Sequence, residues 1–197
     1  MANLYPFLAY VLVTTFTPGP NNILSMSNAM RFGFKRTLGF IAGITTGFCL
    51  VMLACALLNV VLASRLPQVQ LWLNLFGTGY MVYLAVHVLR SGPVEDDADG
   101  RSLNSFAAGF ALQFLNVKVI LYGVTVFSLF ITPVFHNPLS VSLFAPLLAV
   151  VGMLATTCWA LGGDVFRHAL SRHYRLFNVA MASLLVYTAI ASLLSHQ

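Results

Sequence analysis

Six consecutive residues interrupt the first apolar stretch of the chain, and they constrain its fold more than any other feature. The surrounding stretch, residues 4–26, is long and apolar enough to cross a membrane as a helix. Pro18 and Pro20 each lack a backbone donor and clash with the preceding helical turn, while Gly19 adds backbone freedom. Because lipid offers no water to the freed backbone groups, a break at membrane depth must be buried by protein or line a cavity. The sequence therefore predicts a break and a candidate binding site at Thr17, Pro18, Gly19, Pro20, Asn21 and Asn22.

The composition places this break in a membrane protein. Hydrophobic residues make up 59% of the 197-residue chain and charged residues only 8%, whereas soluble domains carry about 25% charged residues. A soluble helical protein would need charged faces that this chain lacks. The length accommodates roughly six helices of about 20 residues each. We therefore expect an all-α membrane protein with six transmembrane helices, at residues 4–26, 38–63, 68–90, 104–131, 139–165 and 176–194, and with short turns at Pro67 and Pro138.

Several functional classes are disfavoured by the sequence. The net charge of +5 comes from basic residues scattered between apolar stretches, without the stripe that nucleic-acid binding needs. Cys49, Cys55 and Cys158 lie inside apolar stretches without paired spacing, which argues against disulfide bonds and a zinc site. Neither a phosphate-binding glycine loop nor a hydrolase motif is present. We expect no catalytic residue, no metal, no cofactor and no nucleic-acid partner.

Lysine and arginine in short loops predict the orientation, because they mark the cytoplasmic side of a membrane protein. Arg65 lies in a loop on one side. Apart from Lys118, the other basic residues lie in or beside the loops after the first, third and fifth expected spans. They are Arg31, Lys35, Arg36, Arg90, Arg101, Arg167, Arg172 and Arg175. Both termini should therefore lie outside the cytoplasm.

A weak internal repeat relates the two halves of the chain. A shift of 99 residues places Phe7 on Phe106 and the break at residues 17–19 on residues 116–118. With an odd number of helices in each half, the halves would have opposite topology. Inverted repeats with interrupted helices at matched positions are typical of secondary transporters, whose site lies at the repeat interface. We predict one domain, residues 1–197, with repeat 1 at about 1–90, a cytoplasmic linker at 91–103 and repeat 2 at about 104–197.

Lys118 is the basic residue that lies well inside an expected span. A charge at this depth is costly, so the side chain should face the protein interior or water. Its ammonium group is suited to bind a substrate carboxylate. The alternatives are that it extends to the membrane surface or that it only neutralises a helix end. Gln113 and Asn116 flank it with amides that both donate and accept hydrogen bonds.

The break in the first span offers complementary groups. A helix that begins after Pro20 would present free N–H groups to a carboxylate, with Asn21 and Asn22 as candidate caps of that helix. The carbonyl groups freed before Pro18 and Pro20 would accept hydrogen bonds from an ammonium group. The two breaks together would therefore suit a small zwitterion.

Two titratable side chains are candidates for proton coupling. Asp164 follows Gly162 and Gly163 near the inner end of the fifth span and is the acidic residue nearest to a span. It could exchange a proton, pair with Arg167 or Lys118, or lie among the lipid headgroups. His87, near the inner end of the third span, is a weaker candidate.

Gly39, Gly43 and Gly47 recur at every fourth residue of the second span. Small residues at this spacing let two helices approach closely. We expect them to pack helices within one chain, with a homodimer face as the alternative.

The pattern as a whole resembles the LysE/RhtB family of amino-acid exporters, and the resemblance covers the whole chain. It rests on residues 17–24 (TPGPNNIL), 112–125 (LQFLNVKVILYGVT) and 158–161 (CWAL). These segments are similar to the cysteine/O-acetylserine exporter branch. Many family members have Asn-Pro-Lys in the fourth span, where this chain has Val117 between Asn116 and Lys118, as that branch does. The second break is therefore less strictly required than the first.

The resemblance implies a multi-pass protein of the bacterial inner membrane that exports small amino acids and their derivatives in exchange for protons. A site for lysine or arginine would need a carboxylate in the membrane interior, and the expected spans offer none there. A small neutral zwitterion therefore fits better. Cysteine and O-acetylserine, or homoserine and threonine in a related exporter, remain open at this point. A membrane-embedded enzyme, an accessory subunit and a purely structural membrane protein are alternatives from other classes.

Overall fold

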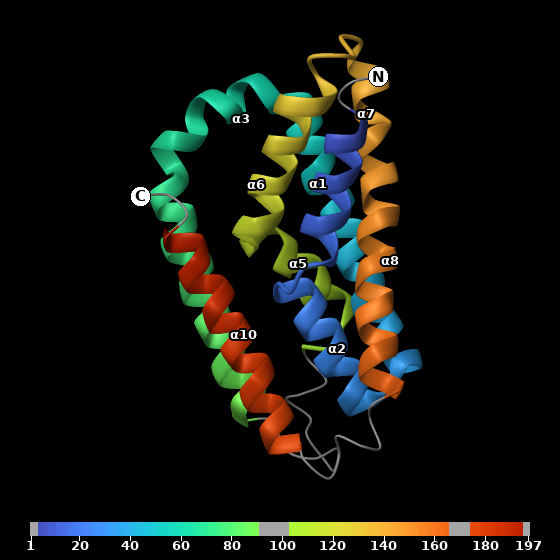
Figure 1. Cartoon of the computed structure of the whole chain (residues 1–197), viewed down its shortest axis with the longest axis vertical. Coiled ribbons are helices and arrows are strands. Elements are labelled where there is room, and N and C mark those ends of the chain that lie inside the picture. The colour runs from blue at the N-terminus through green and yellow to red at the C-terminus, as the bar shows by residue number, and fades with distance from the viewer. Residues whose placement is uncertain (1–3, 91–102, 166–173, 195–197) are drawn as a thin grey trace.

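The computed structural model describes residues 4–90, 103–165 and 174–194, with side chains except at 60–71, 73, 74 and 191–194. All elements of these segments are helices, packed side by side along the long axis of the molecule (Figure 1). The α-helices are α1 (Leu4–Phe16), α2 (Pro20–Phe32), α3 (Phe34–Arg90), α5 (Phe106–Leu115), α6 (Val117–Thr125), α7 (Pro138–Ser142), α8 (Phe144–Val165) and α10 (Tyr174–Leu194), and the π-helix η1 spans Val126–Ile131.

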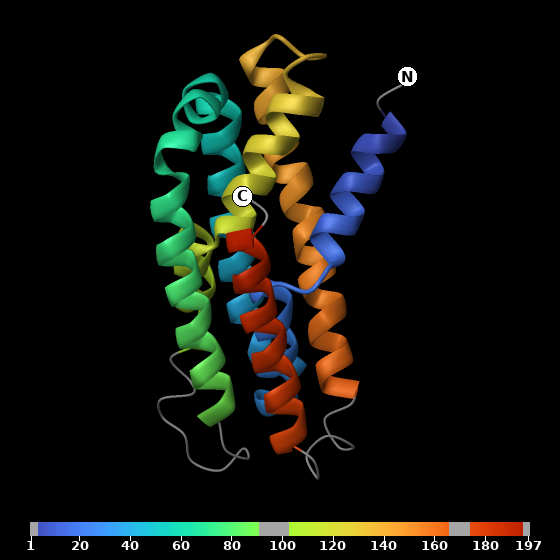
Figure 2. The ribbon, with the colours of Figure 1, turned by 60° about the vertical axis from the view of Figure 1, so that its left-hand side comes forward.

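The break predicted in the first apolar stretch is present. Helix α1 ends at Phe16 and α2 begins at Pro20. The two halves differ in burial, because Val11 is the buried residue of α1 whereas most of α2 is buried. Helix α2 packs mainly against α8, and α1 leans away from the bundle towards its N-terminal end (Figure 2).

The second and third expected spans form the single long element α3. The prediction of a turn at Pro67 is wrong, because the backbone stays helical through this residue. Leu58 instead has a non-helical conformation, with φ −107° and ψ 17°. Figure 1 shows how α3 rises, arches over and descends, so a bent helix reverses the chain without a loop.

The fourth expected span is bent as well. Helix α5 meets α6 and η1 at Asn116 with an angle of 62° between the two parts. The expected turn at Pro138 is present, since Pro138 is the first residue of α7 and the Asn137 side chain accepts a hydrogen bond from the Leu139 amide at 2.9 Å.

The helices support a membrane protein of the all-α class. Phe34–Asn59 and Pro138–Val165 are each long and apolar enough to cross a membrane. The bent pair Phe106–Leu115 and Val117–Ile131 adds a third candidate span if it is counted as one. Leu4–Phe16 and Tyr174–Ile190 are shorter apolar helices within the described segments.

Apart from Lys118, the basic residues whose side chains the structure describes gather at one end of the molecule. The end of α2, both ends of α3 and the start of α10 lie at the lower end in Figure 1, and they carry Arg31, Lys35, Arg36, Arg90 and Arg175. Helix α1 begins near the upper end, and α10 runs upwards from the lower end to about mid-height. Residues 91–102 of the expected linker, with Arg101, lie outside the described residues, as do Arg167, Arg172 and the side chain of Arg65.

Two apolar clusters form most of the core. The upper cluster joins α3, α6, η1 and α8 around Met52 and Phe127. The lower cluster joins α2, both ends of α3, α5 and α10 around Ile23, Phe40 and Leu84. Along the sequence, each break lies between a residue of the upper cluster and a residue of the lower cluster.

Candidate functional site

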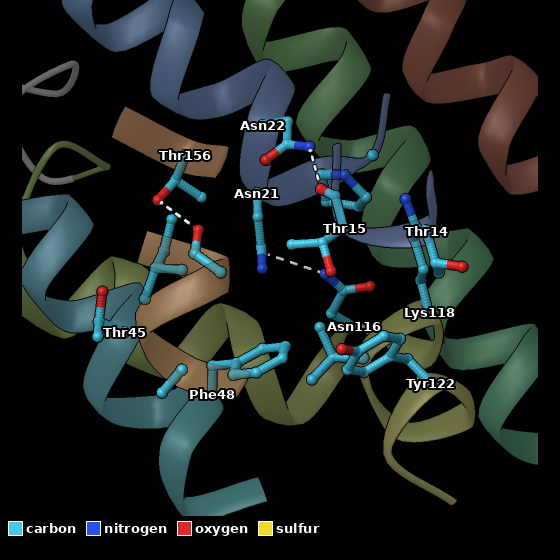
Figure 3. A pocket seen from close by; sticks show the side chains of 16 residues that line it. Thr14, Thr15, Asn21, Asn22, Thr45, Phe48, Asn116, Lys118, Tyr122 and Thr156 are labelled. Atoms are coloured by element: carbon cyan, nitrogen blue, oxygen red, sulfur yellow. Dashed lines mark hydrogen bonds between the residues drawn. The ribbon is translucent and has the colours of Figure 1, made fainter. Parts of the chain in front are cut away.

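A cavity of about 50 Å³ lies between the two breaks (Figure 3). A single buried water needs only about 10–15 Å³ on this measure, so the cavity has room for a small solute group. Its wall comes from both halves of the chain: Thr14, Thr15, Gly19, Pro20, Asn21, Asn22, Ile44, Thr45, Phe48, Asn116, Lys118, Val119, Tyr122, Ala149, Gly152 and Thr156.

The carbonyl groups released by the first break have partners. The last carbonyls of a helix lack intrahelical donors, and in a membrane protein they need others. The Thr17 amide donates to the Val13 carbonyl at 3.0 Å, and the Thr17 hydroxyl donates to the Thr14 carbonyl at 2.9 Å. Asn22 Nδ2 donates to the carbonyls of Thr15 and Thr17 at 2.9 Å each. The Trp159 indole donates to the Phe16 carbonyl at 3.1 Å.

The start of α2 differs from the sequence-based prediction. Gly19 takes the cap position in an extended conformation, and no side chain caps the helix. The prediction that Asn21 and Asn22 cap α2 is therefore wrong. Asn22 reaches back to α1, and Asn21 reaches across to α5 and Asn116. Since the first N–H groups of a helix have no intrahelical partner, the α2 terminus is left to offer them at the cavity wall.

The second break is a single residue. Asn116 has an extended backbone (φ −87°, ψ 95°) between α5 and α6, and its carbonyl accepts from the Val119 amide at 2.9 Å. Its Nδ2 donates to Asn21 Oδ1 at 3.1 Å. The side chain is 2% exposed, and its Oδ1 atom has no hydrogen-bond donor among the described residues. A buried acceptor without a donor at a cavity wall is a candidate ligand contact.

A pair of side-chain amides, Asn21 and Gln113, joins α2 to α5 beside the two breaks. Asn21 Nδ2 donates to Gln113 Oε1 at 2.8 Å, and Gln113 Nε2 donates back to Asn21 Oδ1 at 3.1 Å. Gln113 also donates to the Gly109 carbonyl at 3.0 Å and is fully buried. Gln113 does not line the cavity; it fixes the orientation of Asn21, which does.

Lys118 joins the two breaks directly. Its Nζ donates to the Thr17 hydroxyl at 3.0 Å and to the carbonyls of Thr17 and Pro18 at 3.3 Å each. The freed carbonyls therefore hold an ammonium group, as their chemistry suggests, but it belongs to Lys118. A side chain at Gly19 would crowd this contact, because a Cβ there would lie 3.1 Å from Nζ.

The two proton-coupling candidates lie away from the cavity. Asp164 Oδ1 accepts a hydrogen bond from the Phe34 amide at 3.0 Å, at the start of α3. It follows Thr156 on α8 by eight residues, or about 12 Å along the helix. His87 is partly buried on the descending part of α3, where its ring lies 6.4 Å from that of Tyr83.

The glycine series of α3 divides into two kinds. A Cβ at Gly43 would collide with the Phe106 carbonyl, and one at Gly47 would lie 2.8 Å from the Phe110 carbonyl. Gly43 and Gly47 therefore lie against α5, so this close approach is within one chain. Gly39 has no heavy atom within 4 Å of a built Cβ.

Several cavity residues carry no recognisable signal in the sequence. Thr45 and Thr156 each donate their hydroxyl to a carbonyl of their own helix, Ile41 at 2.9 Å and Gly152 at 3.0 Å. Such threonines look like ordinary helix residues until the fold places them together. Phe48 and Tyr122 also line the cavity, and their ring centroids lie 5.8 Å apart.

The two ends of the cavity carry different kinds of side chain. Figure 3 shows Lys118 and Thr14 on one side of Asn21, and Thr45 and Thr156 on the other. The first end, beside the breaks, holds the ammonium group and the amides. The second end, between α3 and α8, holds Phe48, small residues and two threonine hydroxyl groups that already donate their protons to helix carbonyls. A small ligand with one charged end and one short neutral end fits this arrangement.

Comparison with known proteins places the chain among translocators. It is 41% identical over 187 residues to the cysteine/O-acetylserine efflux protein of Escherichia coli (strain K12), with 95% of each chain covered. Proteins of the same description from Shigella sonnei and Shigella flexneri match with the same identity and coverage. No solved structure matches the chain. Residues 12–196 match the LysE type translocator family. The chain therefore belongs to the LysE type translocators and is a transport protein rather than an enzyme.

Proposed function

We propose that this protein exports cysteine, O-acetylserine and similar small neutral amino acids across the bacterial inner membrane, and that it binds them in the cavity between the two breaks. The observation that carries the proposal is the buried Oδ1 of Asn116, an acceptor without a donor in a wall that also holds a lysine ammonium. The printed descriptions of the relatives, cysteine/O-acetylserine efflux proteins, support the substrate class.

Each charged group of a zwitterion has a complement in this wall. The substrate carboxylate lies at the N-terminus of α2, within reach of Lys118, because free N–H groups and an ammonium both favour an anion. The substrate ammonium donates to Asn116 Oδ1. None of the described residues that line the cavity carries a carboxylate, so a second positive charge, as in lysine, would have no partner.

The helix directions support two inverted repeats with both termini outside the cytoplasm. Across the first break the chain runs downwards in Figure 1, and across the second it runs upwards. The two breaks nevertheless meet, since Lys118 contacts Thr17. We propose six transmembrane helices in two three-helix repeats that work by alternating access, with the basic end of the molecule in the cytoplasm.

Transport by the purified protein in liposomes tests the proposal. Liposomes with an acidic lumen are offered reduced cysteine, O-acetylserine, homoserine, threonine and lysine in parallel, with protein-free liposomes as the control. We expect uptake of cysteine and O-acetylserine above that of homoserine and threonine, and none of lysine. Uptake of no amino acid, or preferred uptake of lysine, would contradict the proposal.

We further propose that export is coupled to proton entry, with Asp164 as the first candidate carrier and His87 as the second. Asp164 also accepts a hydrogen bond at the start of α3, so two variants are needed. Asp164→Asn keeps a capping acceptor but cannot titrate, whereas Asp164→Ala removes both. We expect both to abolish the stimulation by an acidic lumen and only Asp164→Ala to lower the unfolding temperature. If the asparagine variant keeps its pH response, the role of Asp164 is structural and His87→Gln becomes the next test.

A further inference from the structure

Gly152 is the residue of α8 that faces Phe48 across the cavity wall. A Cβ built at Gly152 would lie 3.8 Å from two ring atoms of Phe48, with no closer heavy atom among its surroundings. Phe48 is itself part of the wall and is 7% exposed. The absent methyl group of Gly152 thus corresponds to free space between α8 and the Phe48 ring.

This space lies at the neutral end of the cavity. The Thr156 hydroxyl donates to the Gly152 carbonyl at 3.0 Å, which ties Gly152 to the end that Figure 3 shows opposite Lys118. A zwitterion held by its charged groups at the breaks would direct its side chain here. This step rests on the function proposed above.

The threonine hydroxyl groups at this end offer no proton to the ester of O-acetylserine. Thr45 and Thr156 already donate their hydroxyl protons to carbonyls of their own helices. They retain lone pairs, but no proton for the ester carbonyl of O-acetylserine. Admission of the ester at this end therefore depends on the available space rather than on a donated hydrogen bond.

We propose that Gly152 is a specificity-determining residue, which admits the acetyl ester of O-acetylserine by leaving open the space in front of Phe48. The thiol of cysteine is shorter and does not need this space. A methyl group at position 152 should consequently exclude the longer substrate and spare the shorter one. In an apolar pocket, one methylene changes selectivity by about 10- to 200-fold.

The test measures export of both substrates by Gly152→Ala, at matched protein levels in the membrane. We expect O-acetylserine export to fall at least about 10-fold and cysteine export to stay near that of the unmodified protein. Gly162→Ala is the matched control, because it lies on the same helix with no heavy atom within 4 Å of a built Cβ. It should change neither export rate.

A second variant separates lost space from general damage. Phe48→Leu shortens the opposing side chain, so it should raise the ratio of O-acetylserine to cysteine export and restore O-acetylserine export when combined with Gly152→Ala. An equal loss of both substrates in Gly152→Ala, or no rescue by Phe48→Leu, would overturn the role of Gly152. If the unmodified protein exports neither substrate, the proposed function fails instead.

Discussion

Different interactions keep the backbone non-helical at the two breaks that meet at the cavity. The first, at residues 17–19, is imposed by Pro18 and Pro20, which prevent a continuous helix wherever the segment lies. The second, at Asn116, contains no proline, and its backbone departs from the helix at one residue. The conformation of Asn116 is instead stabilised by a tertiary contact, the hydrogen bond between its side chain and that of Asn21.

The difference separates a break fixed by local covalent chemistry from one fixed by tertiary contacts. The first keeps its shape if its partners are lost, although its carbonyls would then lack donors. The second should straighten if its partners are lost, because a valine or an asparagine can continue a helix. Five substitutions, grouped in four predictions, test this distinction, from the largest expected effect to the smallest.

Lys118→Met should have the largest effect, because Lys118 bridges both breaks. Methionine keeps an unbranched side chain but removes the ammonium group from the Thr17 and Pro18 carbonyls. A hydrogen bond to a charged group contributes about 1.5–3 kcal/mol, so export should fall roughly 10- to 100-fold. Export of labelled O-acetylserine from cells measures this. Lys35→Met, at an exposed position, is the control, and equal export by the two variants would refute the role of Lys118.

Gly43→Ala should destabilise the protein, because its Cβ would overlap the Phe106 backbone where α5 crosses α3. Overpacking typically costs about 1–3 kcal/mol, and here it moves the helix that precedes the second break. Gly39→Ala, one turn away and with open space, should be neutral or stabilise by up to about 1 kcal/mol. Thermal unfolding in detergent compares the two. Similar unfolding temperatures would mean that α5 does not depend on this close approach.

Asn21→Ala and Asn22→Ala should weaken one break each. Asn21→Ala releases Asn116 and Gln113, whereas Asn22→Ala leaves the Thr15 carbonyl without its donor. Each lost bond should cost about 1 kcal/mol. Spin-label distances across α5 and α6 should lengthen in Asn21→Ala as the bend straightens, and those across α1 and α2 should hold in Asn22→Ala. Straightening of both spans, or of neither, would contradict the distinction.

Val117→Pro should have the smallest effect and sharpen the comparison most. Asn116 is already extended, as a residue before proline should be, and Val117 is the first residue of α6, where proline is tolerated. We expect a stability change below about 1 kcal/mol. In this background Asn21→Ala should cost less than in the unmodified protein, and a double-mutant cycle measures the coupling. Strictly additive costs would mean that proline and Asn21 do not stabilise the same bend.

The sequence predicts the first break because its cause is local. It also points to residues 116–118 through the repeat offset, but the bend at Asn116 depends on Asn21, which is distant in sequence. Pro67 shows the limit of local rules, since the helix continues through it and departs from helical geometry at Leu58. The cavity wall is largely invisible in sequence, because Thr45, Gly152 and their neighbours meet only through helix packing.

The hydrogen bond from the Trp159 indole to the Phe16 carbonyl fixes the end of α1 that lies beside the cavity, so α1 can tilt about that end. The helix has 13 residues and is therefore about 20 Å long, and Val11 is its buried residue. A tilt of about 15° about the Phe16 end would carry the Leu4 end by about 5 Å over that length. The same tilt would scarcely move the carbonyls that hold Lys118, or Thr14 and Thr15 in the cavity wall, so the outer part of α1 can change its angle while the charged end of the cavity stays assembled.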